Sequence, residues 1–373
     1  MMTDSAFIQP PPAVQAKKSD SLMRRQRYYG WLMGSPAFLG LILFIFVPFI
    51  MALVLSFSNQ RLLSPNPTEN VGFRNYDRLL AVTVLKQNAQ YDEQQKLLLD
   101  EKGAPQFERL RTVLRKDPSY KGYSELSTFT FNETRLVILA KDPIFIKSFI
   151  NTIQFAILVI PLQCGAALLL ALLVNMGLKG TNFFRTAYFA PVVTSMVVVS
   201  IVWTFLYHKD VGLINEFLSK ISFGMIDKIN WLGDPKWAMP AIVIMSAWQG
   251  AGYQMLIFLA GLQNISEDLY EAASLDGANS WQKFVNVTLP GLRNTTIFVI
   301  ISTTIAAFGL FTQVSVMTAG GPADSTTTVM YHAVRKGFRE QDIGYGSTIS
   351  VVYFLVILAI AMGQKYYFDK REK

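Results

Sequence analysis

Residues 263–290 read QNISEDLYEAASLDGANSWQKFVNVTLP, a stretch that predicts two helices joined by a turn. Ser266 can cap the first helix, whose opening turn carries two carboxylates that the positive end of the helix dipole favours. Gly277 can take the left-handed conformation that ends this helix. Ser280 can cap the second helix, and Pro290 can end it. Because such an exposed helix pair carries an apolar stripe, it needs a partner to cover that stripe.

Long apolar runs flank this loop and recur along the chain. Six of them lack Asp, Glu, Lys, Arg and His, and they cover residues 31–57, 149–174, 186–207, 237–262, 295–317 and 347–362. The last helix is expected to extend to residue 367. A bilayer core needs about 20 mostly apolar residues in a helix. With 51% hydrophobic and only 16% charged residues in 373, the chain does not fit a soluble or disordered class. The sequence predicts an all-α integral membrane protein with six transmembrane helices.

The basic residues predict how these helices are oriented. Lys and Arg gather ahead of the first run, in the loops at residues 175–185 and 263–294, and in the tail at residues 368–373. Cytoplasmic segments of membrane proteins carry such an excess. We therefore expect a flexible cytoplasmic leader at residues 1–30, a cytoplasmic tail, and membrane lipid as a partner. This placement explains the formal net charge of +8 without a nucleic-acid partner.

The longest segment between predicted spans, residues 58–145, differs from its surroundings because it is charged. Within it, an insert at about residues 81–141 has apolar residues near helical spacing. These residues are Leu97, Leu98, Leu99, Phe107, Leu110 and Leu114. We expect a mainly helical extracytoplasmic subdomain, and a plain spacer loop is the alternative.

The predicted spans hold no ionisable residue, which limits the possible mechanisms. A charge in mid-membrane normally marks a proton relay or an ion site, so its lack disfavours a self-sufficient secondary transporter. Backbone carbonyls can bind sodium, so this rival stays open. The sequence has no G-x-x-x-x-G-K-[ST] loop, and any nucleotide hydrolysis must belong to another subunit.

Three kinds of residue could carry chemistry, but each has a simpler explanation. His208 and His332 lie near the outer ends of predicted spans without partners at metal-ligand spacing, so we expect surface or interface histidines and no metal site. The single cysteine, Cys164, excludes a disulfide framework and is expected to be a packing residue. Prolines inside the spans can kink helices around a pathway or only serve packing. No nucleophile and base stand together, so a membrane-embedded enzyme is weakly supported.

The loop between the fourth and fifth runs combines Glu271-Ala272-Ala273, Gly277 and Val287-Thr288-Leu289-Pro290, separated by three and nine residues. This combination resembles the EAA loop of permease subunits of bacterial ATP-binding-cassette (ABC) importers, with Val287 where isoleucine is usual. Flanking motifs such as Val71-Gly72-Phe73-Arg74-Asn75-Tyr76 and Gly320-Gly321-Pro322 are similar to those of carbohydrate permeases of the maltose-transporter (MalF-like) family. The insert at about residues 81–141 departs from the pattern of this permease family.

The resemblance implies a subunit of a larger complex in the bacterial cytoplasmic (inner) membrane. Its partners would be a second homologous permease, an ATPase dimer and an extracytoplasmic solute-binding protein. This chain would not be an enzyme and would hold no cofactor, because ATP and Mg²⁺ would be bound by the ATPase subunits. The insert would help to dock the binding protein. The contact with the ATPase would be made by Glu271, Ala272, Ala273, Asp276, Gly277, Leu289 and Pro290.

By the same resemblance, the spans on either side of the loop would hold a sugar or an oligosaccharide midway across the membrane. The candidate pathway residues are Trp248, Gln249, Gly250, Tyr253, Phe308, Phe311 and Gln313. Aromatic faces and neutral hydrogen-bonding groups suit sugars. Small and aromatic residues also serve helix packing, so both roles stay open for each residue. Glycerol phosphate or a charged oligosaccharide is the alternative cargo.

Overall fold

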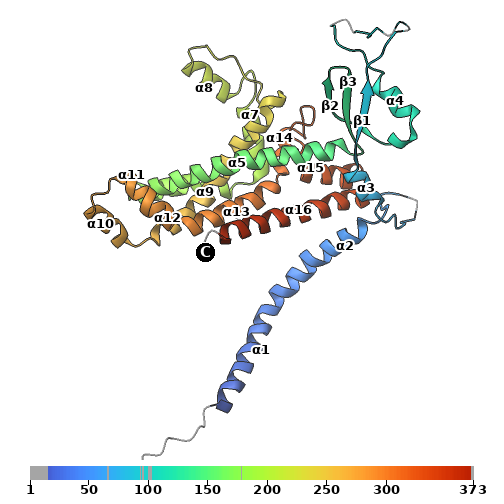
Figure 1. The fold of residues 1–373 in the computed structure, drawn as a ribbon. Helices are drawn as coiled ribbons and strands as arrows, with labels where there is room; N and C mark the ends of the chain where they lie inside the picture. The colour runs from blue at the N-terminus through green and yellow to red at the C-terminus, as the bar shows by residue number, and fades with distance from the viewer. Residues whose placement is uncertain are drawn as a thin grey trace, which may run out of the picture. The chain divides into compact units, whose positions relative to one another are not determined.

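The computed structural model describes residues 16–64, 67–92, 94, 96–99, 103–177 and 179–370 (Figure 1). Of the flexible leader predicted at residues 1–30, residues 1–15 lie outside the described residues, and residues 16–30 are not a flexible segment but part of the helix α1. Of the tail predicted at residues 368–373, residues 368–370 belong to α16 and residues 371–373 lie outside the described residues. The chain divides into two units, Met1–Val54 and Leu55–Lys373.

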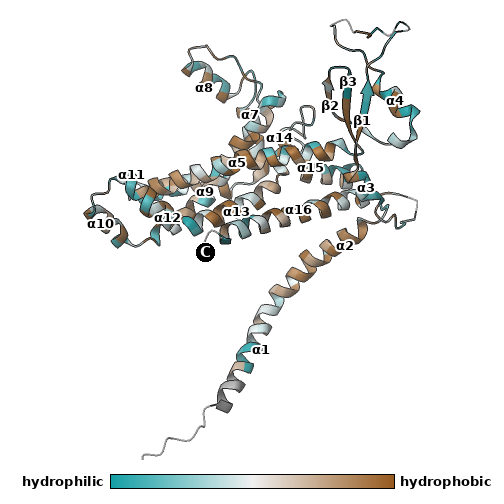
Figure 2. Ribbon diagram, viewed as in Figure 1, coloured by the Kyte–Doolittle hydropathy of each residue, from teal (hydrophilic) through white to brown (hydrophobic). Residues whose placement is uncertain are grey.

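The first unit holds the first predicted span. It contains α1 (Ala16–Leu41), the short π-helix η1 (Ile42–Phe46) and the start of α2 (Val47–Leu55). Residues Met23–Leu55 form one helix that is long and apolar enough to cross a membrane. Figure 2 shows hydrophobic residues along α2 and more hydrophilic ones towards the start of α1.

The second unit is mainly helical. Its elements are α3 (Arg74–Leu80), β1 (Val82–Asn88), α4 (Leu110–Lys116), η2 (Pro118–Tyr120), β2 (Ser124–Phe131), β3 (Thr134–Ala140), α5 (Pro143–Asn175), α6 (Thr181–Val193), α7 (Met196–Leu206), α8 (Leu213–Ile221), α9 (Pro235–Gln263), α10 (Glu267–Leu275), α11 (Ser280–Lys283), η3 (Phe284–Thr288), α12 (Leu289–Gly291), α13 (Arg293–Phe308), α14 (Thr312–Met317), α15 (Val329–Val334), η4 (Arg335–Arg339) and α16 (Ile343–Lys370). In Figure 1, the strands and α10 lie at opposite ends of the layer formed by α5, α9, α13 and α16.

Four helices of the described chain qualify as membrane spans, and six spans result if each of two bent helix pairs counts as one. The third predicted span is one of these pairs, because α6 and α7 meet at 100°. The bend follows from extended backbone at Thr194 and Ser195, just after Pro191, which removes a helical hydrogen bond. The second pair joins Ser280–Gly291 to α13 at 65°. The prediction of apolar spans is therefore supported, but not that of six continuous helices. The third is bent, and the fifth, predicted at residues 295–317, is divided into α13 and α14 at residues 309–311.

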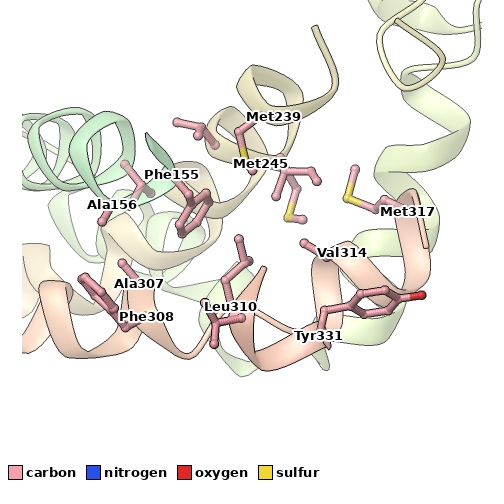
Figure 3. Packing of buried hydrophobic residues seen from close by; sticks show 14 of the residues in the cluster. Phe155, Ala156, Met239, Met245, Ala307, Phe308, Leu310, Val314, Met317 and Tyr331 are labelled. Atoms are coloured by element: carbon pink, nitrogen blue, oxygen red, sulfur yellow. The ribbon is translucent and has the colours of Figure 1, made fainter. Parts of the chain in front are cut away.

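Small residues allow the helices of the second unit to approach closely. Gly252 in α9 is an example, because a side-chain carbon there would lie 2.1 Å from the carbonyl oxygen of Tyr188 in α6. A hydrophobic core forms where α5, α9, α13, α14 and α15 meet (Figure 3). Phe155, Met245 and Leu310 are among its buried side chains. This core fixes the helices around the cavity that lies beside it.

The insert is not mainly helical, so this prediction was wrong. It contains an antiparallel sheet of order β1-β3-β2, packed against the short helix α4. The strands are rich in Val, Ile, Thr, Leu and Phe, and burial alternates along β1, which is the two-residue period of a strand. Only Leu110 and Leu114 of the residues that suggested a helix lie in one, while Leu97 and Leu99 form isolated β-bridges.

Candidate functional site

The predicted helix-turn-helix corresponds to α10 and α11. The Ser266 hydroxyl accepts a hydrogen bond from the Asp268 amide (3.3 Å) and so caps α10. Gly277 follows α10 with φ +78°, the left-handed conformation that glycine adopts without strain. This conformation ends α10 and turns the chain toward α11.

The second helix begins and ends differently from the prediction. Asn279, not Ser280, is its cap, and it forms a reciprocal pair of hydrogen bonds with Gln282. Pro290 does not end the helical path, because it lies in the first turn of α12, where a missing amide hydrogen costs little. The direction of the chain changes instead at Leu292, between α12 and α13.

The loop presents apolar side chains to its surroundings while hydrogen bonds hold its parts together. No side chain of α10 is buried, and Leu275 is 90% exposed. The Tyr270 hydroxyl lies 2.9 Å from that of Thr288, and the Lys283 ammonium donates to the Ser274 hydroxyl (2.6 Å). The residues predicted to contact the ATPase lie on this surface, and all of them are exposed except Ala273, which is half-buried. They are Glu271, Ala272, Ala273, Asp276, Gly277, Leu289 and Pro290.

A cavity of about 320 Å³ lies among α5, the bend between α6 and α7, α9, α13 and the start of α14. Its wall carries hydroxyl, amide and phenol groups and no charged side chain among the described residues. The polar residues that line it are Gln163, Ser246, Gln249, Tyr253, Gln254, Ser302, Thr303 and Gln313. This arrangement can offer hydrogen bonds to a neutral polar molecule without burying a charge.

A chain of hydrogen bonds runs along this wall. The Gln163 amide donates to Gln254 (2.6 Å), and the Gln254 amide donates to the Thr303 hydroxyl (2.6 Å). The Thr303 hydroxyl donates to the carbonyl oxygen of Val299 (2.6 Å). Gly250 leaves space for the Gln163 amide, because a side-chain carbon at position 250 would lie 2.3 Å from Nε2 of Gln163. Gln163, Gln254 and Thr303 therefore each have a hydrogen-bond partner, which holds the two amides in place.

The predicted pathway residues divide into two groups. Gln249, Gly250, Tyr253 and Gln313 line the cavity. The other three do not. Trp248 packs against Trp203 (ring centroids 5.5 Å apart) and lines a separate apolar pocket. Phe308 is 4% exposed and packs on Tyr353, and the ring of Phe311 lies 6.2 Å from that of Tyr331.

Sequence reasoning missed Gln163, Gln254 and Thr303. All three are neutral, and none of them is among the seven pathway residues that the resemblance implies. Their signal was nevertheless present, since an amide side chain within an apolar run must find a hydrogen-bond partner in the protein. Which residues would pair could not be read from spacing, because Gln163 and Gln254 are 91 positions apart.

At the ends of two spans, a second polar cluster joins the starts of α5 and α16 to α15. Asp142 caps α5, and its Oδ2 accepts a hydrogen bond from the Tyr345 hydroxyl (2.6 Å) and lies 2.9 Å from Nε2 of His332. Burial raises the pKa of the Asp142 carboxyl, but the bonds from His332, Tyr345 and the Phe145 amide outweigh it and hold the pKa well below its usual range.

The two histidines differ in position. His208 is exposed, as expected. His332 is completely buried, so the prediction of a surface or interface residue was wrong for it. The reason is Asp142, which lies 190 positions away and gives Nε2 of the buried imidazole a partner, while Nδ1 has none among the described residues. The described residues contain no group of three His, Cys, Asp or Glu that could hold a metal ion. Cys164 is half-buried, 3.7 Å from the Thr303 hydroxyl.

Residues 136–373 match the family described as "Binding-protein-dependent transport system inner membrane component". The match covers more than half of the chain, and the chain therefore belongs to this family. Members are permease subunits of ABC transporters, which are not themselves enzymes, so the chain is a multi-pass protein of the inner membrane. The match begins at β3, so most of the insert lies outside it.

Known proteins similar to this chain include two permeases. The lactose transport system permease protein LacF of Rhizobium radiobacter is 37% identical over 236 residues, which cover 62% of this chain and 78% of LacF. The sn-glycerol-3-phosphate transport system permease protein UgpA of Yersinia pestis bv. Antiqua (strain Antiqua) is 30% identical over 239 residues, which cover 64% of this chain and 80% of UgpA.

The fold is similar to that of a chain in the crystal structure of a bacterial ABC transporter involved in the import of the acidic polysaccharide alginate. The TM-score is 0.64 at 18% identity, and the superposition covers 96% of this chain and 100% of that chain. At this level of identity, the likeness concerns the fold alone.

Proposed function

We propose that this member of the binding-protein-dependent transport family forms half of the translocation pathway of an ABC importer for a sugar or an oligosaccharide. The observation that carries the proposal is the cavity beside α9, whose described wall combines neutral hydrogen-bonding groups with the ring of Tyr253. Sugars are recognised by such groups, because their hydroxyls need partners and their C–H faces pack on aromatic rings. The similarity to LacF favours the same class of cargo.

The pathway in this proposal follows the cavity and not the whole set of predicted residues. Gln249, Gly250, Tyr253 and Gln313 would meet the substrate, together with Gln163. Trp248, Phe308 and Phe311 would act in packing, at a helix surface or in the core. A second homologous permease would supply the other half of the pathway.

The exposed loop would transmit ATP hydrolysis to the spans. ATP and Mg²⁺ would be bound by a dimer of ATPase subunits, and α10 would dock against one of them through Glu271 and its neighbours. The exposed Leu275 gives this contact apolar surface to bury. Because hydrogen bonds tie α10 to α11 and η3, a displacement of α10 would reach α13 through α12.

The orientation follows from the same assignment. The ATPase acts in the cytoplasm, so α10 and both termini would lie on the cytoplasmic side. The insert, at the opposite end of the helical layer, would then face outward, where a solute-binding protein delivers the cargo (Figure 1). One face of the sheet packs on α4, and the other carries exposed Val84 and Phe131, which would help to dock this protein.

The same type of complex importing glycerol phosphate or a charged oligosaccharide is the second candidate, favoured by the similarity to UgpA. The cavity argues against it, because its described lining offers no basic side chain to a phosphate. A thermal-shift screen of the cognate binding protein decides between the two. Stabilisation of the binding protein by neutral oligosaccharides would support a sugar as the cargo. Stabilisation by glycerol 3-phosphate alone would favour the second candidate instead.

The class of transporter is tested by purifying the protein through a C-terminal tag in mild detergent and identifying what co-purifies by mass spectrometry. We expect an ATPase and a second permease in stoichiometric amounts, and ATP-dependent uptake after reconstitution with the binding protein. A lone, homogeneous chain that supports uptake by itself would contradict the proposal and favour a secondary transporter.

A further inference from the structure

A second cavity, of about 510 Å³, lies next to the starts of α5 and α16. It is lined by residues from the segment after α2, from α3, from the connection before β2, and from the positions just ahead of α5 and α16. Five basic side chains face two acidic ones on this wall, which leaves an excess of three positive charges. We call it the basic cavity, and its charged residues are Arg61, Arg74, Asp77, Arg78, Lys121, Lys141 and Asp342.

Ion pairs within the basic cavity account for both acidic groups. The carboxylate of Asp77 pairs with Lys141 (2.5 Å), and that of Asp342 pairs with Arg78 (3.0 Å). The three remaining basic residues, Arg61, Arg74 and Lys121, form no ion pair with any residue that the structure describes. They are exposed, so their charges act on whatever approaches this surface.

The lining favours an anionic group over a sugar ring as the occupant. It contains charged side chains and asparagines but no aromatic ring among the described residues. An oligosaccharide would find no flat surface for its C–H faces there. A group with negative charge would find three unpaired cations.

We propose that the basic cavity is the docking site for an acidic surface segment of the extracytoplasmic binding protein. The inference rests on the proposed function, which places this end of the molecule outside. Charge complementarity selects the occupant, because the cavity is open at the surface and its free charges are arginine and lysine. The insert contributes Lys121, so a partner seated on the sheet can reach the cavity as well.

Docking at this place contacts the starts of two membrane helices. Lys141 directly precedes Asp142, the cap of α5, and Asp342 directly precedes α16. The guanidinium of Arg78 lies 3.9 Å from the centre of the Tyr345 ring, and the Tyr345 hydroxyl donates to Asp142. A carboxylate that competes for Arg78 or Lys141 therefore acts on groups that hold α5 and α16 together.

The test uses the complete importer in proteoliposomes and measures ATPase activity against the concentration of substrate-loaded binding protein at several salt concentrations. For the variant Arg61→Glu/Arg74→Glu/Lys121→Glu, we expect the half-saturating concentration to rise about tenfold at low salt. The difference should shrink at high salt, because ions screen exposed charges. The activity at saturation should stay unchanged, since these residues touch neither substrate nor ATPase.

Two controls keep the result interpretable. Lys220→Glu reverses an exposed charge on α8 and should leave the half-saturating concentration as in the wild type. The neutral variant Arg61→Gln/Arg74→Gln/Lys121→Gln should show a smaller rise, and it provides the test if the charge-reversed chain fails to fold. A wild-type complex that binding protein does not stimulate would contradict the proposed function. Normal stimulation with the same half-saturating concentration and salt dependence in wild type and variants would overturn this inference alone.

Discussion

Among single residues, Gly250 is the position where the cavity wall depends on a missing side chain. The variant Gly250→Ala would place a carbon 2.3 Å from Nε2 of Gln163 and displace the amide that bonds to Gln254. Loss of that hydrogen bond costs about 0.5–1.5 kcal/mol of stability. We expect an assembled complex with reduced uptake and a changed KM, measured with radiolabelled substrate in proteoliposomes.

The matched control is Gly165→Ala, in α5, where an added carbon would meet nothing within 4 Å. Alanine favours helix over glycine by about 1 kcal/mol, so this variant should be as active as the wild type and no less stable. If Gly250→Ala transported as well as Gly165→Ala, the wall near Gln163 would not be part of the pathway.

Asp142 is the residue on which the buried cluster at the starts of α5 and α16 depends. The variant Asp142→Asn removes the charge that both His332 and Tyr345 approach, which should cost about 3 kcal/mol because the remaining polar groups stay buried. Folding lowers the pKa of Asp142, so its carboxylate stabilises the fold above its unfolded value of about 4. This contribution is lost as the pH falls through the lower folded value.

Thermal unfolding in detergent checks this prediction. The Tm of Asp142→Asn should lie below that of the wild type at neutral pH, and the difference should shrink as the pH falls below about 4. Glu108→Gln, which breaks an exposed pair with Lys116, should change stability by no more than about 1 kcal/mol. Equal Tm values for wild type and Asp142→Asn would show that the cluster does not stabilise the fold.

Among the elements, α10 carries the proposed coupling to the ATPase. Glu271→Lys reverses an exposed charge, and Gly277→Pro is incompatible with φ +78° because proline fixes φ near −65°. Both variants should abolish ATP-dependent uptake while membrane insertion stays intact, since α10 has no buried residue. Uptake and the amount of co-purified ATPase are the measurements.

Asn294→Lys is the control for this element, because it adds an exposed positive charge near the start of α13 but outside α10. It should transport as the wild type does. Unchanged uptake in both Glu271→Lys and Gly277→Pro would remove α10 from the coupling path and leave the exposed surface around Leu275 without the role proposed for it.

At the scale of the whole molecule, the insert behaves as an attachment to the helical unit. Val82 and Ala140 pair directly in the sheet, so the chain ends that flank the insert lie side by side. Replacing residues 82–140 with a short glycine linker should leave insertion and assembly intact. ATPase stimulation by the binding protein should require a higher concentration of that protein, because a docking surface is lost.

Size-exclusion chromatography and ATPase titration of the shortened complex check this prediction. Stimulation at wild-type concentrations of binding protein would show that the insert takes no part in docking. Failure of the shortened chain to assemble would instead show that the insert stabilises the membrane part of the protein.

The sequence alone determined the features that depend on local pattern. Apolar runs predicted the spans because a helix must match the bilayer, and Ser266 and Gly277 marked the limits of α10 because caps act within one turn. Only the tertiary structure decided what depends on residues far apart in the chain. The Gln163 amide donates a hydrogen bond to Gln254, and the buried His332 has Asp142 as its partner. The insert forms a sheet because its strands pair with one another. Such pairing leaves no trace in sequence spacing, since the energy of a buried polar group or a strand is set by the partner that folding brings to it.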